Sequence, residues 1–157
     1  MKLRKVKRRS RPRSVRHDRR QPSAARVQDS RQVALLAAQA GLDKKASGVE
    51  IVDVSGKVDY ADYLVLMTGQ SDRHVAAIAQ SVDEFVSRHG HDAISVEGLP
   101  KANWVLIDFV DVVVHVFLEE ARSLYDLDGL WMDARRVPVP DAEGMPTLRG
   151  ESSAGES

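Results

Sequence analysis

The chain of 157 residues contains no cysteine, which excludes disulfide bonds, thiolate metal sites and a cysteine nucleophile. It also has no apolar run close to the roughly 18 residues that a membrane-spanning helix needs, so we expect no membrane partner. Aromatic residues are scarce, at 5% of the chain. The apolar content of 43% and the charged content of 29% are typical of globular proteins, and a chain of this length most often forms one domain.

The formal net charge is zero, but charges of opposite sign are separated along the chain. Residues 1–31 hold 13 Lys and Arg against two acids, a balance of +11. Residues 32–157 hold 10 Lys and Arg against 21 acids, a balance of −11. This asymmetry predicts a basic arm on an acidic body, and it excludes a nucleic-acid-binding protein of uniformly basic type.

Composition divides the chain into an arm at 1–31, an ordered body at 32–137 and a tail at 138–157. The arm has few apolar side chains and many like charges, so we expect it to be disordered. Its charge favours contact with RNA phosphates, with a solubilising tail or a targeting segment as the alternatives. The second tail is rich in Pro, Gly and Ser, which also predicts disorder.

The body alternates predicted helices with predicted strands. Apolar periodicity predicts one helix that starts at Asp29 or Ser30 and another that Ser71 caps and Gly90 ends. The segment 119–131 reads as a short third helix. Runs of apolar and β-branched residues predict strands at 49–54, 60–67, 93–97, 104–109 and 111–118. This alternation predicts an α/β domain.

The strands at 104–109 and 111–118 form a predicted hairpin that turns at Phe109-Val110. Val110 is poorly suited to the positive φ of such a turn. One face of the hairpin is aliphatic and belongs to the core. The other face carries Trp104, Leu106, Asp108, Asp111, Val113, His115 and Phe117. Because burying two acids without partners is costly, this second face must be partly wet or covered by a partner.

Three strings in the body match the pattern of a known family: DKKA, YADYLVLMTGQSDRHVAAIAQSV, and SVEGL followed by ANWVLIDFVDVVVHVFLEEARSLYDLDGLW. Over about residues 32–133 they resemble the ribosomal silencing factor family, also called Iojap-like. The resemblance implies a single domain with a mixed β-sheet flanked by helices, related to nucleotidyltransferases but without their activity. In one departure, this chain has Val110 where many members have Gly.

The resemblance also implies a function. Members of this family bind the large ribosomal subunit at its fourteenth protein, block joining of the small subunit and repress translation when nutrients are scarce. We therefore expect a cytoplasmic regulator that needs no cofactor and catalyses no reaction. The acidic body agrees with this expectation, because ribosomal proteins are basic and charge complementarity steers association.

Five of the eight aromatic residues lie between 104 and 131, and Trp and Tyr are typical interface anchors. The residues that we expect to bind the partner are Trp104, Asp108, Asp111, His115, Tyr125, Leu127 and Trp131. The two acids would face basic groups, and a buried core position is the alternative for Trp131. A second copy of the chain is an alternative occupant of this face when the protein is free.

Other residues offer weaker hypotheses. His89 and His91 have no third ligand nearby in sequence, so we expect no metal site. The segment Gly69–Ser71 precedes a helix and could cradle a phosphate, but no acid pair follows that could hold Mg²⁺. A nucleotidyltransferase-like, nucleotide-binding enzyme remains the alternative function. Additional partner contacts are predicted at Asp62, Arg73 and His74.

Overall fold

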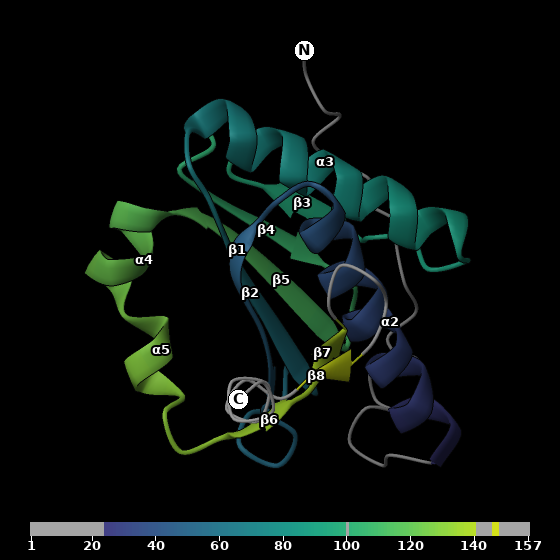
Figure 1. Ribbon diagram of the computed structural model, residues 1–157. Coiled ribbons are helices and arrows are strands. Elements are labelled where there is room, and N and C mark those ends of the chain that lie inside the picture. Colours follow the sequence, from purple (N-terminus) through teal and green to yellow (C-terminus); the bar gives the residue numbers. More distant parts are fainter. Residues whose placement is uncertain (1–23, 100, 141–145, 148–157) are drawn as a thin grey trace, which may run out of the picture.

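The computed structural model describes residues 24–99, 101–140 and 146–147. A six-stranded sheet with the order β3-β4-β5-β2-β1-β6 forms its centre (Figure 1). The strands are β1 (Ser47–Asp53), β2 (Tyr63–Gly69), β3 (Ser95–Glu97), β4 (Trp104–Asp108), β5 (Val112–Leu118) and β6 (Arg135–Val137). The pair β2–β5 is parallel and its neighbours pair antiparallel. The predicted α/β class with a mixed sheet is therefore confirmed.

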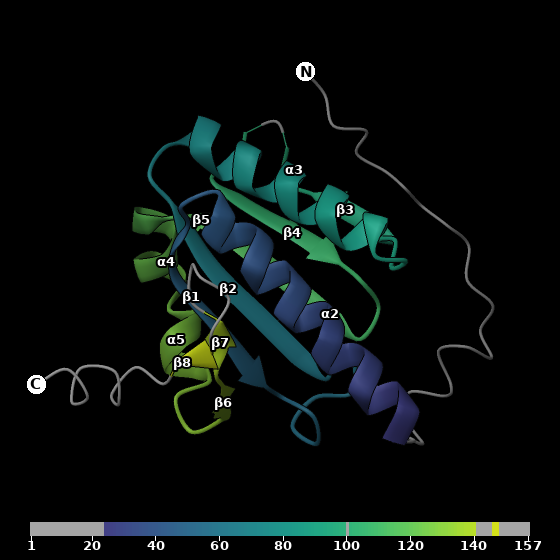
Figure 2. The same ribbon diagram turned by 45° about the vertical axis from the view of Figure 1, so that its right-hand side comes forward.

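Two long helices, α2 (Ala24–Asp43) and α3 (Asp72–Arg88), cover one face of the sheet (Figures 1 and 2). The main core lies between these helices and that face, and it includes Ile51, Val65 and Val114. The opposite face, which we call the outer face, carries a smaller apolar cluster. The short helices α4 (Glu119–Tyr125) and α5 (Leu127–Leu130) lie on that side, where α4 packs on β2 and β5.

The helix α3 begins and ends where local sequence signals place it. The Ser71 hydroxyl accepts a hydrogen bond from the backbone N–H of His74, and Asp72 lies in the positively polarised first turn. Gly90 follows the helix at φ +94°, which suits glycine. The buried side chains are Val75, Ile78, Ala79, Val82, Asp83 and Val86. The predicted apolar stripe is therefore present, with Phe85 at its partly exposed edge.

The helix α2 begins at Ala24, earlier than the predicted start at Asp29 or Ser30. Ser30 lies inside the helix, where its buried hydroxyl donates to the Asp62 carboxylate at 3.2 Å instead of capping a helix end. The end of the predicted disordered arm is therefore helical. The first turns of α2 are polar but rich in good helix formers, so apolar periodicity could not reveal them. Residues 1–23 lie outside the described residues.

The predicted tail also begins with ordered structure. The strand β7 (Val139–Pro140) pairs with β8 (Pro146–Thr147), and Val139 packs against the main core. Described structure therefore continues past residue 137, where the sequence placed the end of the body. Strands this short carry no periodic pattern that a sequence could display. Residues 141–145 and 148–157 lie outside the described residues.

The β4–β5 hairpin keeps the predicted faces but not the predicted turn. Asp108 lies opposite Val113, so the turn is centred on Val110-Asp111 instead of Phe109-Val110. Moving the turn by one residue shifts the pairing register by two residues. Because side chains alternate with a period of two, each strand residue stays on its predicted face.

Val110 adopts a φ of +83°, an unfavourable region for a β-branched residue. Its backbone N–H donates to the Asp108 carboxylate at 2.8 Å. The next backbone N–H, that of Asp111, donates to the carbonyl of Phe109 at 3.1 Å. These bonds close a tight turn around Val110, so the expected conflict between this residue and its backbone is real.

Candidate functional site

The outer face of β4 is partly open. Trp104, Leu106 and Asp108 are partly exposed there, whereas the residues that alternate with them are buried under α3. On the edge strand β3, Glu97 is exposed and lies opposite Leu106. We call Glu97, Trp104, Leu106 and Asp108 the β4 surface. It combines an apolar centre with an acidic rim, which is the composition of many protein interfaces.

Trp104 is held by two neighbours on β5. Its indole Nε1–H donates to Nδ1 of His115 at 3.0 Å. Its ring centroid lies 5.3 Å from that of Phe117, and the rings of His115 and Phe117 stack with an angle of 11° between them. Because Nδ1 accepts the indole hydrogen, the proton of the neutral imidazole must lie on Nε2.

His115 itself lies beneath the surface, with 8% of its area exposed. Burial lowers its pKa from 6.5 to about 4, because the charged imidazolium is disfavoured away from water. At neutral pH the ring is therefore uncharged. The structure places this predicted contact residue behind Trp104, on the same outer face.

The two acids of the hairpin differ in position. Asp108 ends β4 on the outer face, and its Oδ1 accepts the Val110 N–H in the turn. Asp111 lies in the turn itself and not in β5 as predicted, and its carbonyl accepts the backbone N–H of Asp62 at 2.7 Å. Both side chains are partly exposed. Only Asp108 belongs to the β4 surface.

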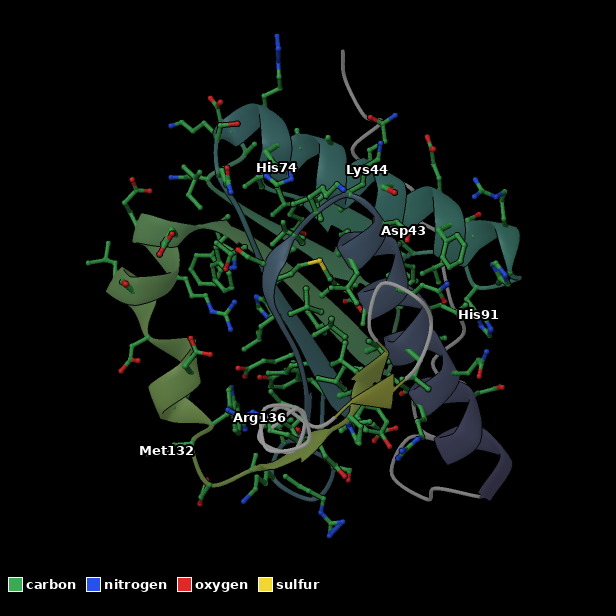
Figure 3. The ribbon with its side chains drawn as sticks, viewed as in Figure 1. Asp43, Lys44, His74, His91, Met132 and Arg136 are labelled. Carbon is green, nitrogen blue, oxygen red and sulfur yellow. The ribbon has the colours of Figure 1, made fainter. Side chains whose placement is uncertain are left out.

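The additional contact residues have separate locations. Asp62 is buried and joins α2 to the start of β2 through Ser30. Arg73 is exposed in the first turn of α3. The Nε2 of His74 lies 2.8 Å from the carbonyl of Lys44, and Figure 3 shows these residues side by side. The fold does not bring these three residues to the β4 surface.

The polar groups of the candidate phosphate loop before α3 form hydrogen bonds with residues of α3 itself. The Gln70 N–H donates to Nδ1 of His74 at 2.9 Å, and Ser71 accepts the His74 N–H. A Cβ on Gly69 would lie 3.0 Å from the backbone nitrogen of Val75, so close packing explains this glycine. Within the described part of the chain, no cluster of three or more His, Cys, Asp or Glu could hold a metal ion.

The segment 119–134, which we call the strap, crosses part of the outer face. The sequence predicted one short helix, but Asp126 at φ +49° separates α4 from α5. Trp131 is partly buried against the smaller apolar cluster, whereas other apolar side chains of the strap are exposed. The exposed ones are Leu124, Leu130 and Met132. The side chains of Tyr125 and Leu127 lie outside the described residues.

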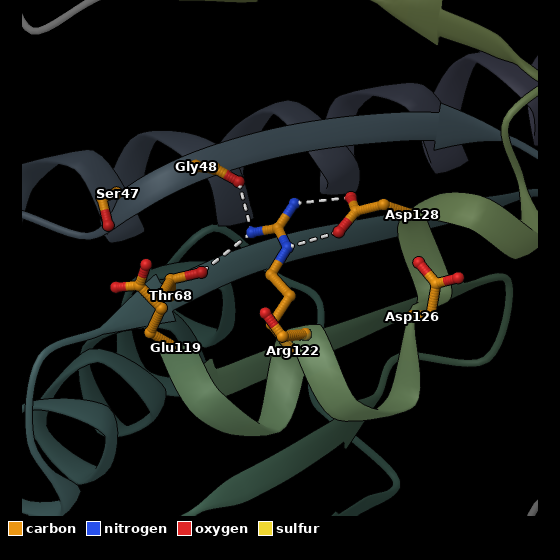
Figure 4. A pocket seen from close by; sticks show the side chains of 8 residues that line it. Ser47, Gly48, Thr68, Glu119, Arg122, Asp126 and Asp128 are labelled. Atoms are coloured by element: carbon orange, nitrogen blue, oxygen red, sulfur yellow. Dashed lines mark hydrogen bonds and ion pairs between the residues drawn. The ribbon is translucent and has the colours of Figure 1, made fainter.

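Arg122 attaches the strap to the sheet beside an open pocket (Figure 4). Its guanidinium donates twice to the Asp128 carboxylate, with both distances 2.9 Å. It also donates to the carbonyl of Gly48 at 2.7 Å and to the hydroxyl of Thr68 at 2.9 Å. The hydrogen bonds from Arg122 to the Asp128 carboxylate, together with the positive charge of the guanidinium, hold the pKa of Asp128 below its ordinary value.

Arg122, Leu106 and Glu97 were absent from the predicted site. The partners of Arg122 on β1 and β2 are distant in the sequence, so no local pattern signals this contact. Leu106 was assigned to the correct face but not to the binding residues. Glu97 joins them only because β3 pairs with β4.

The family model described as "Ribosomal silencing factor during starvation" matches residues 27–156. A ribosomal silencing factor RsfS of Bacillus subtilis (strain 168) is 40% identical over 108 residues, which cover 69% of this chain and 89% of that protein. The crystal structure of protein CV0518 from Chromobacterium violaceum has a TM-score of 0.64 at 35% identity and covers 66% of this chain and 86% of its own. A crystal structure from Bacillus halodurans has a TM-score of 0.62 at 35% identity, and the match covers 69% of this chain and 99% of that chain.

The residues that the family model matches include all six strands of the central sheet, the helices α3, α4 and α5, and all of α2 except its first three residues. None of the helices in the described part of the chain is both long and apolar enough to cross a membrane. The family resemblance of the sequence is confirmed, and the chain belongs to the family of ribosomal silencing factors.

Proposed function

We propose that this protein binds the large ribosomal subunit, through its fourteenth protein, and prevents the small subunit from joining. Family membership supports a role at the ribosome. The observation that carries the proposal is the open β4 surface, where a tryptophan and a leucine stay partly exposed between two acids. An apolar centre inside a charged rim is suited to a protein partner.

Electrostatics supports a basic partner. The sequence from residue 32 onward carries a balance of −11, and Glu97 and Asp108 flank the apolar centre of the β4 surface. Proteins that bind RNA, such as those of the ribosome, carry many Lys and Arg. Complementary charge speeds the encounter and disfavours acidic competitors. The affinity then comes from Trp104 and Leu106, with Trp131, Tyr125 and Leu127 of the strap as further proposed contacts.

The proposed mechanism is steric. A domain bound to the face of the large subunit that meets the small subunit occupies the space that the small subunit needs. No bond is made or broken, and translation falls because fewer complete ribosomes assemble. The required property is affinity alone, which a few well-packed anchor side chains supply.

A binding experiment with purified large subunits tests the site. Trp104→Ala removes the proposed central anchor, and we expect co-sedimentation to weaken roughly 30- to 1000-fold, the usual effect of losing an anchor. Tyr60→Ala is the matched control, because Tyr60 is an exposed aromatic residue outside the β4 surface. If Trp104→Ala folds normally and binds as well as the native chain, the β4 surface is not the site.

A second experiment tests the consequence of binding. Adding the protein to separated subunits should leave more of them unjoined on a sucrose gradient, and Trp104→Ala should abolish this effect. Binding without any effect on joining would contradict the steric mechanism while leaving the site intact.

A further inference from the structure

His115 is a polar residue in an otherwise apolar cluster. Its neighbours on the outer face are the aromatic ring of Phe117 and the aliphatic side chain of Val113, both buried. A buried imidazole without a hydrogen-bond partner would be destabilising. This position therefore favours a purely apolar residue unless the ring has a specific role. The hydrogen bond from the Trp104 indole to Nδ1 of His115 indicates that role.

The pairing register shows that this bond runs diagonally. The residue directly opposite Trp104 is Phe117, and the residue opposite His115 is Leu106. The indole therefore lies against the Phe117 ring while its N–H edge reaches sideways to the imidazole, whose centroid is 5.9 Å away. Stacking restrains the plane of the indole, and the hydrogen bond selects which edge points inward. Together they favour one orientation of a side chain that is partly exposed.

We propose that His115 is a positioning residue for Trp104: its Nδ1 holds the indole in the orientation that meets the large subunit, and His115 does not contact the subunit itself. The inference rests on the proposed function and assigns a different role to a residue that the sequence placed among the contacts. Fixing the anchor before binding lowers the ordering cost of association, so the hydrogen bond increases affinity without belonging to the interface.

A double-mutant cycle separates positioning from direct contact. His115→Leu has a similar volume but no acceptor, and we expect it to weaken binding to purified large subunits about three- to tenfold, the effect of losing one hydrogen bond. Trp104→Phe keeps an aromatic ring but has no N–H to position. In that background His115→Leu should change affinity by less than about twofold, because the two residues act as one unit.

Two further variants sharpen the comparison. His115→Asn places an amide oxygen near the position of Nδ1, so binding should be restored to within about twofold of the native chain. Val52→Ala truncates a buried side chain elsewhere on the outer face. It should lower stability while leaving affinity unchanged. A loss of affinity in Val52→Ala equal to that in His115→Leu would show that general packing, and not positioning, explains the effect.

A spectroscopic readout is independent of ribosome binding. The chain has two tryptophans, so the Trp131→Phe background reports on Trp104 alone. In free protein the Trp104 indole N–H should exchange slowly with solvent in NMR spectra, and His115→Leu should speed that exchange whereas His115→Asn should not. This measurement tests positioning even if the native chain fails to bind large subunits, which would overturn only the proposed function.

Two results would overturn the inference while the proposed function stands. One is an equal loss of affinity from His115→Leu in both Trp104 backgrounds, which would make His115 a direct contact. The other is unchanged affinity in His115→Leu together with unchanged exchange of the Trp104 N–H.

Discussion

At the scale of single residues, Val110 has a backbone conformation that its branched side chain disfavours. Its φ of +83° lies in a region that L-residues with a branched Cβ strongly disfavour. The turn persists because hydrogen bonds to Asp108 and Phe109 hold it and because the two long strands on either side must meet there. Such local strain survives only where surrounding structure determines the backbone.

We predict that Val110→Gly stabilises the protein. Glycine removes the strain at positive φ but gains freedom in the unfolded chain, so the net gain should be roughly 0.5–1.5 kcal/mol. Urea unfolding of both proteins measures the difference. Val110→Ala serves as control, because it keeps Cβ and should fall between the two. A less stable glycine variant would show that the turn is not strained.

His115 makes stability depend on pH. In the unfolded chain its imidazole takes up a proton near its ordinary pKa of 6.5, but in the folded protein the pKa is about 4. Between these values the unfolded state binds more protons, so stability falls as the pH falls. The stability that depends on the neutral imidazole is fully present above about pH 6.5 and lost by about pH 4. The difference amounts to roughly 3 kcal/mol in the free energy of unfolding.

The measurement is urea unfolding between about pH 7 and pH 4, on the native chain and on His115→Leu. We expect stability to fall more steeply in the native chain, because the variant has no imidazole to protonate. Other titrating groups contribute equally to both curves. Parallel curves would contradict the low pKa of the buried ring.

At the scale of structural elements, the strap differs from the two long helices. The helices α2 and α3 are anchored by many buried apolar side chains, whereas the strap buries few of its own, among them Ala121 and Ala134. Arg122 joins it to the sheet through hydrogen bonds to Gly48 and Thr68, and its two bonds to Asp128 connect α4 with α5 inside the strap. Gly48 adopts a φ of +55°, which favours glycine, and a Cβ there would lie 2.8 Å from the guanidinium of Arg122. An element held this way should open before the rest of the fold.

We predict that Arg122→Ala loosens the strap without unfolding the sheet. Hydrogen exchange should become faster at residues 119–134 and remain slow in β2 and β5. Because the side chain is only 12% exposed and its bonds are charge-assisted, the loss of stability should be about 2–3 kcal/mol.

Two control variants accompany this experiment. Arg122→Lys keeps the charge but not the two-pronged geometry, so it should recover only part of the stability. Arg135→Ala removes an exposed arginine from β6 and should have little effect on the exchange of the strap. Unchanged exchange in Arg122→Ala would mean that the other contacts of the strap, its apolar packing and the bonds from Arg136 to the Trp131 and Ala134 carbonyls, are sufficient to hold it.

At the scale of the whole molecule, the separation of charge is the dominant feature. The first 31 residues carry a balance of +11 and the rest −11, and we propose that the acidic part meets a basic partner while the basic arm contacts phosphates. Because α2 begins at Ala24, removing residues 1–23 deletes most of the basic residues of the arm without cutting a described element. This truncation tests the proposed contact between the arm and ribosomal RNA.

We predict that removing residues 1–23 weakens binding to large subunits at low salt and flattens its salt dependence. Every phosphate that the truncated chain no longer neutralises should reduce the slope of log K against log salt by roughly 0.7–0.9, because fewer counterions are released. A chain with the Lys and Arg of residues 1–23 changed to Gln controls for length and should behave like the truncation. If affinity and slope both stay unchanged, the arm does not bind phosphates.

Features that depend on near neighbours could be predicted from the amino-acid sequence alone. The cap at Ser71, the stop at Gly90 and the stripe of α3 follow from residues a few positions apart, which local hydrogen bonding and helical periodicity specify. The two faces of the hairpin followed from alternation, which a shift of two residues in register does not disturb. The family followed from long ordered strings that extend over most of the body.

The exposure of each predicted residue, and the meeting of residues distant in the chain, depend instead on the assembled fold. Whether His115 faces solvent or lies beneath Trp104 depends on how the strands pack and on what covers them, and alternation specifies only its face. The position of the turn at Val110-Asp111 depends on the register in which β4 pairs with β5, because alternation does not distinguish registers that differ by two residues. The Arg122 contacts join elements far apart in the chain. Such contacts form only when the whole sheet assembles, because no short segment contains both partners.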